Sequence, residues 1–119
     1  MVRVHIVRDK EGLVREYEIK GHARSGKHGQ DIVCAAVSVI AYTSINALDE
    51  LAGIKLYEDD GTNRFIEKDG YMKCVLPCDI DPEKKQTVKV ILDTMAVGFK
   101  QLIETPEYRR YISILDEEV

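Results

Sequence analysis

The sequence is poor in several residue types, and each shortage narrows what the protein can be. It has no tryptophan, three cysteines and three prolines, and aromatic side chains make up 7% of its 119 residues. Its 17 basic and 21 acidic side chains give a net charge of −4. This balance excludes a strongly basic nucleic-acid-binding protein of the usual kind, and we expect no direct contact with nucleic acid. The charge is also too small and too mixed for a disordered acidic chain.

The three cysteines do not form a disulfide framework. Cys34 stands alone, and Cys74 and Cys78 would lie about 13 Å apart on an extended strand at ~3.3 Å per residue. A disulfide needs Cα atoms about 4.4–6.8 Å apart. No histidine and cysteine residues have the spacing of zinc ligands, and we expect neither a metal nor another cofactor. Without the apolar segment of a signal peptide, the chain is predicted to be cytoplasmic.

Long apolar runs, repeats and linkers are not expected either. We predict no run of the ~18–20 apolar residues that a membrane span requires, and therefore no membrane partner. The length fits a single domain, residues 1–119, with enough chain to bury one core.

The hydrophobic pattern predicts an α+β fold: two long helices packed on a mixed or antiparallel β-sheet, in the order ββαβββαβ. Alternation over residues 2–8 and 13–20 predicts an opening hairpin. Further strands are expected at residues 54–58, 71–76 and 111–115, whereas residues 64–67 are ambiguous. The acidic residues 116–118 are expected to form a solvated tail.

Both helices have recognisable ends. Asp31 is expected to be the N-cap of a helix over residues 32–51 that stops at Gly53. This helix is apolar on nearly every side, so we expect a sheet on one side and a second helix or a partner subunit on the other, with Ile40 pointing outward. The second helix is expected to start at Asp81-Pro82-Glu83 and to end at Pro106.

The residues that could carry chemistry lie between Gly21 and Ser38. With Asp31 as N-cap, Cys34 would occupy the first helical turn, where the helix dipole favours a thiolate and the Asp31 carboxylate opposes it. His22, at the end of the second strand, would face Cys34 across a loop, as a general base faces a cysteine nucleophile. His28 is a less constrained alternative base. The other interpretation makes Cys34 a small buried residue of the core.

Three glycines punctuate this segment and also allow two interpretations. Gly21, Gly26 and Gly29 are either ordinary turn residues or part of a mobile cover over a substrate cleft. Their spacing fits neither of the glycine-rich nucleotide-binding motifs, so a nucleotide site is weakly supported. Backbone N–H groups of the first helical turn are expected to stabilise an oxyanion.

Taken together, the segment G-H-A-x-x-G-x-x-G-x-D-I-V-C-A-A-V-S, residues 21–38, resembles the signature of the ribosomal-processing cysteine protease family, Prp. The resemblance implies a homodimeric endopeptidase that removes a short N-terminal extension from a large-subunit ribosomal protein precursor. It implies Cys34 as nucleophile and His22 as catalytic histidine, with Asp31 and Ser38 in supporting positions. The alternative is a non-catalytic ribosome-associated or assembly factor in which Cys34 is structural.

Overall fold

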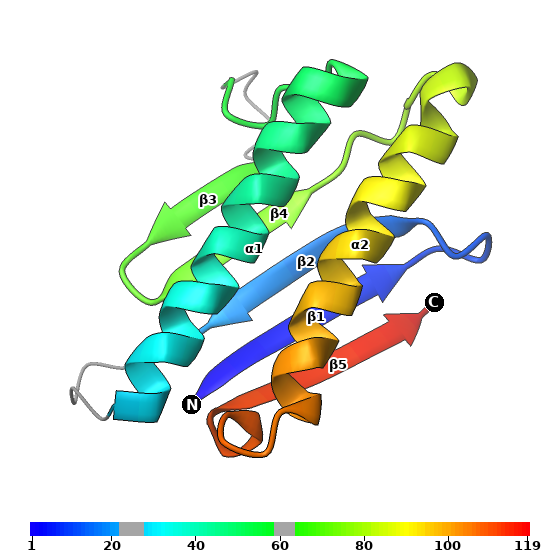
Figure 1. Ribbon diagram of the computed structural model, residues 1–119. Coiled ribbons are helices and arrows are strands. Elements are labelled where there is room, and N and C mark those ends of the chain that lie inside the picture. The colour runs from blue at the N-terminus through cyan, green and yellow to red at the C-terminus, as the bar shows by residue number, and fades with distance from the viewer. Residues whose placement is uncertain (22–27, 59–63) are drawn as a thin grey trace.

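A mixed sheet with two helices on one face makes up the part of the chain that the structure describes (Figure 1). The computed structural model describes residues 1–21, 28–58 and 64–119, and of residues 28–31 only the backbone. The sheet order is β3-β4-β2-β1-β5, with β1 antiparallel to β2 and parallel to β5. The strands are β1 (Val2–Arg8), β2 (Val14–Lys20), β3 (Phe65–Lys68), β4 (Tyr71–Val75) and β5 (Ile112–Glu118). The predicted α+β class is confirmed.

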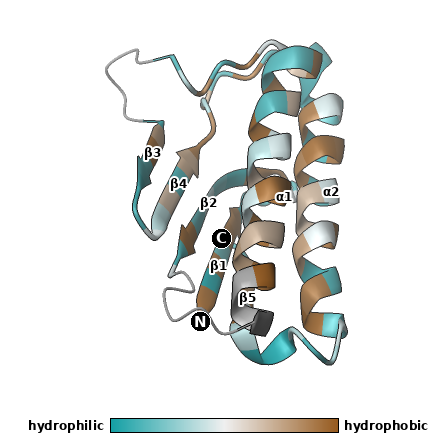
Figure 2. Cartoon of the chain, turned by 60° about the vertical axis from the view of Figure 1, so that its left-hand side comes forward, coloured by the Kyte–Doolittle hydropathy of each residue, from teal (hydrophilic) through white to brown (hydrophobic). Residues whose placement is uncertain are grey.

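The two faces of the sheet differ in chemistry because strand side chains alternate. Both helices lie on the same side of the sheet, as Figure 2 shows. On that side the strands bury apolar residues, among them Val4, Ile6 and Tyr17. The other side carries charged residues, and His5 of β1 contacts Glu117 of β5 there at 2.7 Å. This alternation is typical of a sheet with one solvated face.

Helix α1 (His28–Ala52) starts earlier than predicted. Gly29 therefore belongs to its first turn rather than to the preceding loop, and Asp31 lies inside the helix rather than at its N-cap. Cys34 is then the seventh helical residue, in the second turn, so its predicted place in the first turn is also wrong. The physical reason is that one glycine costs a helix only about 1 kcal/mol, too little to stop residues 28–30 from continuing it.

The packing of α1 explains its apolar composition. One stripe, which includes Val33, Val37 and Ile45, is fully buried in the core. Residues Ile32–Ala52 have the length and the hydropathy, 1.6, of a membrane-spanning helix, contrary to our expectation that no run would be long enough. In this structure the helix packs on the sheet and on α2 (Figure 2).

Helix α2 (Lys85–Glu104) follows the short 3₁₀ helix η1 (Pro82–Lys84). The Asp81 side chain accepts the backbone N–H of Glu83 at 3.0 Å, which confirms the predicted start, and the helix ends before Pro106 as predicted. A β-carbon added to Gly98 would lie 3.2 Å from Ile40 Cδ1. Ile40 therefore packs against α2 and does not point outward as predicted.

Two further predictions, both on residues outside the helices, are wrong. Residues 54–58 form a turn rather than a strand, because the C-terminus of α1 holds them: Ile54 N–H donates to the carbonyl of Leu48 at 2.9 Å. The acidic residues 116–118 are not a tail but the end of β5, in register with Ile6 to Arg8 of β1. The positive charges of Arg8 and Lys100 beside Asp116 make this pairing possible. The ambiguous residues 64–67 fall largely in β3.

Candidate active site

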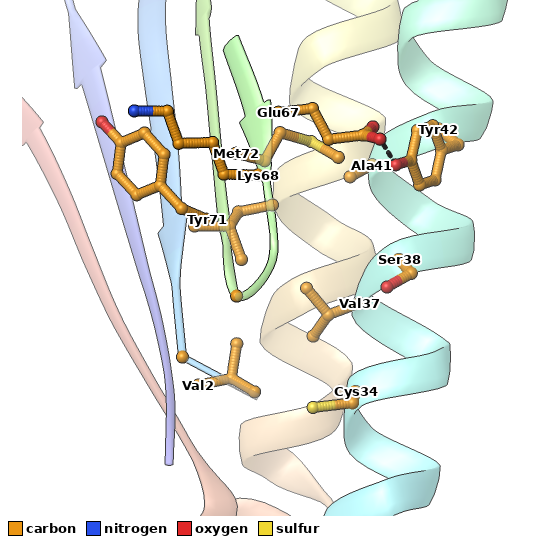
Figure 3. Close-up of a pocket in the computed structure, with 13 residues that line it drawn as sticks. Val2, Cys34, Val37, Ser38, Ala41, Tyr42, Glu67, Lys68, Tyr71 and Met72 are labelled. Carbon is orange, nitrogen blue, oxygen red and sulfur yellow. Dashed lines mark hydrogen bonds between the residues drawn. The ribbon is translucent and has the colours of Figure 1, made fainter. Parts of the chain in front are cut away.

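A pocket of about 140 Å³ lies between α1 and the hairpin formed by β3 and β4 (Figure 3). Cys34 lies at one end of the pocket, and Tyr42 and Glu67 lie at the other. The walls between them are mainly apolar, made by Val2, Ile19, Val37, Ala41 and Met72. The pocket is thus a short groove with a sulfur at one end and a carboxylate at the other.

Helix α1 supplies both Cys34 and Ser38 to this groove. The two residues are four positions apart, so they lie on the same helical face, one turn from each other. Cys34 is half-buried and Ser38 is exposed. Neither of the other two cysteines lines the groove: Cys78 is exposed elsewhere, and Cys74 lies in the core, where burial raises its pKa to about 12.

Gly21 also lines the groove. Its φ is +90°, and a β-carbon there would lie 2.2 Å from the Met1 carbonyl oxygen. Its N–H donates to the carbonyl of Gly70, in the turn between β3 and β4, at 2.9 Å. Gly21 therefore packs against Met1 and bonds to the β3–β4 turn, and it also lines the pocket.

Two of the predicted site residues, His22 and Gly26, lie outside the described residues, as do the side chains of His28 and Asp31. The pairing of His22 with Cys34 stays a prediction. What the structure adds is that Gly21, the residue directly before His22, lines the same pocket as Cys34.

The far end of the groove is closed by a contact that the sequence did not predict. The Tyr42 hydroxyl of α1 donates a hydrogen bond to the Glu67 carboxylate of β3. This hydrogen bond, with a smaller contribution from burial, raises the pKa of Tyr42 to about 12, so the phenol keeps its proton at neutral pH. No sequence signal pairs a helix residue with one 25 positions later on a short strand, and the ambiguity of residues 64–67 hid the contact.

The site contains no candidate metal centre in the ranges that the structure describes. Across those ranges, no group of three or more histidine, cysteine, aspartate or glutamate residues is placed to hold a metal ion. The chemistry that the groove itself offers is that of a thiol beside a short, mostly apolar cleft.

The family described as cysteine protease Prp matches residues 1–113 of this sequence. The chain belongs to the Prp family of cysteine proteases. It is 31% identical over 102 residues to the ribosomal processing cysteine protease Prp of Bacillus subtilis, covering 86% of this chain and 87% of the relative. It is also 31% identical over 117 residues to the Prp of Staphylococcus aureus, covering 96% and 97%.

Solved structures show the same fold. The Streptococcus mutans protein SMU.848 superposes with a TM-score of 0.79 at 29% identity, over 100% of this chain and 96% of the other. Prp from S. aureus in complex with a substrate peptide gives a TM-score of 0.78 at 26% identity, over 98% and 100%. The S. aureus protein has also been solved with a covalently linked product peptide, with a TM-score of 0.75 at 28% identity over 98% and 100%.

Proposed function

We propose that this protein is a cysteine endopeptidase that removes a short N-terminal extension from a large-subunit ribosomal protein, with Cys34 as nucleophile and His22 as general base and acid. The observation that carries the proposal is that Cys34 lines the same groove as Gly21, the residue directly before His22 in the sequence. The names of the relatives, which describe ribosomal processing, support the substrate class. The peptide complexes of the S. aureus protein support a peptide substrate.

In the proposed reaction, His22 takes the proton from the Cys34 thiol as the sulfur attacks the carbonyl carbon of the scissile bond. The C–N bond then breaks, and His22 returns the proton to the leaving amine. Water, deprotonated by His22, hydrolyses the thioester that remains, which releases the second product as a carboxylic acid and restores the thiol.

The backbone N–H of Cys34 is not placed to stabilise an oxyanion. Cys34 lies in the second turn of α1, so its own N–H is bonded within the helix to the carbonyl of residue 30 and faces no substrate. Ser38 offers a hydroxyl on the same helical face, with β-carbons about 5–6 Å apart. We assign it the role of a hydrogen-bond donor to the bound peptide. The apolar walls between Cys34 and Glu67 fit an extended peptide with apolar side chains near the scissile bond.

The test is cleavage of the source organism's ribosomal protein precursor, followed by mass spectrometry. The wild type is expected to remove an N-terminal peptide, and Cys34→Ala and His22→Ala are expected to lower the rate at least a thousandfold, on the order seen when a nucleophile or its base is removed. Cys78→Ala, which changes an exposed cysteine outside the groove, is the matched control. Full activity of Cys34→Ala would contradict the nucleophile, and a wild type that does not cleave would favour the assembly-factor alternative.

We also propose that the protein works as a homodimer in the cytoplasm, where ribosomal proteins are made. The outward surfaces of α1 and α2 support the dimer, since Val39, Leu51, Val90 and Val97 are exposed there. These residues border a groove of about 500 Å³ between the two helices. Contiguous apolar surface of this kind marks interfaces between proteins.

A further inference from the structure

The groove is lined by two charged residues that the proposed reaction does not use. Glu67 and Lys68 both line the groove, but they point in opposite directions (Figure 3). The Glu67 carboxylate points toward α1, whereas the Lys68 ammonium group points to the other side of the hairpin, as does the Tyr71 ring. No ion pair of Glu67 with another of the described residues is present, and the contact that its carboxylate makes there is the hydrogen bond from Tyr42.

One oxygen of the Glu67 carboxylate accepts a hydrogen bond from the protein, and the other can still accept one from a ligand. Tyr42 donates to one of its oxygens, Oε2. The charge also contributes, after burial, to raising the pKa of Tyr57. Glu67 therefore makes the far end of the groove negative, while its other oxygen can still accept a hydrogen bond from a bound peptide.

The distance from Cys34 to this charge can be expressed in substrate residues. Cys34 and Tyr42 are eight positions apart on α1, which at 1.5 Å per residue is about 12 Å along the helix axis. An extended peptide advances about 3.3 Å per residue. A peptide that lies along the groove with its scissile bond at Cys34 reaches Tyr42 and Glu67 after about three or four residues.

We infer that Glu67 is a specificity-determining residue: it selects substrates that carry a lysine or arginine about three or four residues from the scissile bond. Tyr42 is the positioning residue that fixes the carboxylate through its hydroxyl. The inference rests on the proposed role of Cys34, because the position of the scissile bond is counted from its sulfur. If the hydrogen bond between Tyr42 and Glu67 served only to hold α1 against β3, the cleavage rate would not depend on the charge of the substrate.

The experiment measures kcat/KM for quenched fluorescent peptides that span the cleavage site of the precursor. Each position other than the scissile pair is replaced in turn by lysine or by norleucine, which has a similar chain and no charge. For the wild type we expect lysine to be favoured about fivefold over norleucine at one position, as an ion pair worth about 1 kcal/mol provides. In 1 M salt the preference should approach one, since the Debye length is then about 3 Å.

Substitutions at Glu67 and Tyr42 distinguish an effect of the Glu67 charge on the substrate from an effect on the fold. Glu67→Gln keeps an acceptor for Tyr42 and is expected to abolish the lysine preference, while Glu67→Lys is expected to reverse it. Tyr42→Phe leaves the charge but frees the carboxylate, so the ratio of kcat/KM for lysine over norleucine peptides should fall to between the wild-type and Glu67→Gln values and should still decrease in 1 M salt. Glu50→Gln, an exposed carboxylate of α1 that does not line the groove, is the matched control.

The outcomes distinguish this inference from the proposed function. An equal lysine preference in wild type and Glu67→Gln, or no preference at any position in the wild type, would overturn the role of Glu67 while the protease stands. No cleavage by the wild type, or cleavage by Cys34→Ala, would instead overturn the proposed function.

Discussion

At the scale of single residues, the glycine that precedes His22 has a steric reason to be there. Gly21 combines a positive φ of +90° with a backbone approach so close that a β-carbon would lie 2.2 Å from the Met1 carbonyl oxygen. Backbone atoms cannot give way as the end of a flexible side chain can. Since Gly21 also bonds to Gly70, a shift here would move the end of β2 against the β3–β4 turn, where both line the groove.

We therefore predict that Gly21→Ala loses more stability than the same change at a glycine that has only the unusual φ. Gly12→Ala is the matched control, because its φ is +82° but the nearest atom to a new β-carbon is the end of a lysine side chain at 3.8 Å. Gly12→Ala should cost about 1–2 kcal/mol of unfolding free energy, and Gly21→Ala at least about 3 kcal/mol. Urea denaturation measures both. Equal losses would show that the contact with Met1 relaxes freely.

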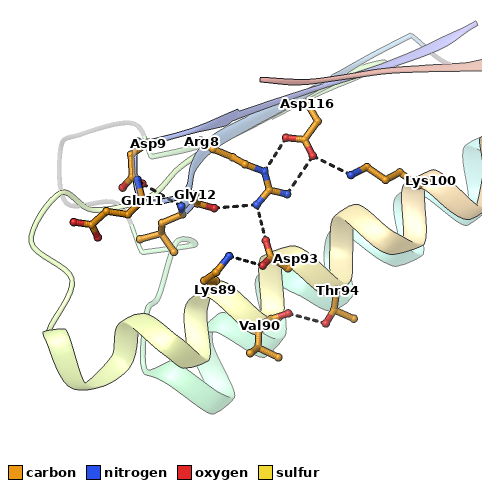
Figure 4. Close-up of polar contacts among 11 residues, drawn as sticks. Arg8, Asp9, Glu11, Gly12, Lys89, Val90, Asp93, Thr94, Lys100 and Asp116 are labelled. Carbon is orange, nitrogen blue, oxygen red and sulfur yellow. Dashed lines mark hydrogen bonds and ion pairs between the residues drawn. The ribbon is translucent and has the colours of Figure 1, made fainter. Parts of the chain in front are cut away.

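At the scale of elements, an ion-pair network joins the end of β1 and β5 to α2 (Figure 4). Arg8 of β1 donates to Asp116 of β5 at 2.8 Å and to Asp93 of α2 at 2.6 Å. Its guanidinium also donates to the carbonyl of Gly12 in the hairpin turn. One side chain thus connects β1, β5, α2 and the β1–β2 turn.

This network makes stability depend on pH in the acid range. Hydrogen bonding from Arg8 is the main reason that the pKa of Asp116 is lowered. For Asp93, burial acts to raise the pKa, but hydrogen bonds from Arg8 and Lys89 outweigh it and the net shift is downward. Carboxyls with lowered folded-state pKa values stabilise the fold above their unfolded pKa, about 3.9, and lose this contribution as pH falls through the folded value.

We predict that Asp116→Asn lowers the free energy of unfolding by about 1.5–3 kcal/mol at pH 7, as expected for a hydrogen bond to a charged group. The difference from wild type should shrink as the pH falls below about 4, because the wild-type carboxyl then becomes protonated as well. Urea titrations at pH 7 and at progressively lower pH give both values. A difference that stays constant down to the acid limit would mean that the carboxylate charge contributes nothing.

Comparison with the sequence predictions shows which elements local patterns determine. The opening hairpin, β4, the Asp81 start of α2 and its end before Pro106 follow from alternation, capping and proline, which are local signals. The turn at residues 54–58 and the extension of β5 over Asp116 depend instead on partners distant in the sequence, Leu48 and Arg8. In the site, the Gly21–Ser38 motif predicted Cys34, but nothing local predicted Glu67.

At the scale of the whole molecule, the uncovered face of the sheet and the outer surface of the two helices differ in polarity. The uncovered face of the sheet is mostly charged, with His5, Glu18 and Lys73 among its residues, and suits contact with water. The outer surface of the helical layer is apolar: Val39 is 66% exposed and Val97 is 59% exposed. A second copy packed on the helical surface would cover these side chains, which do not line the Cys34 groove.

We predict that Val97→Glu converts the dimer to a monomer, because two glutamates would lose hydration in an apolar contact between copies. Leu115→Glu is the matched control: Leu115 is 54% exposed, about as much as Val97, but lies on β5. Ile40, which packs against Gly98, is unsuitable because a charge there would disrupt the contact between α1 and α2. Light scattering on a size-exclusion column should give twice the chain mass of 13.5 kDa for the wild type and Leu115→Glu, and the single mass for Val97→Glu. A wild type of single mass at tens of micromolar would refute the dimer, and a dimeric Val97→Glu would move the interface away from the helical surface.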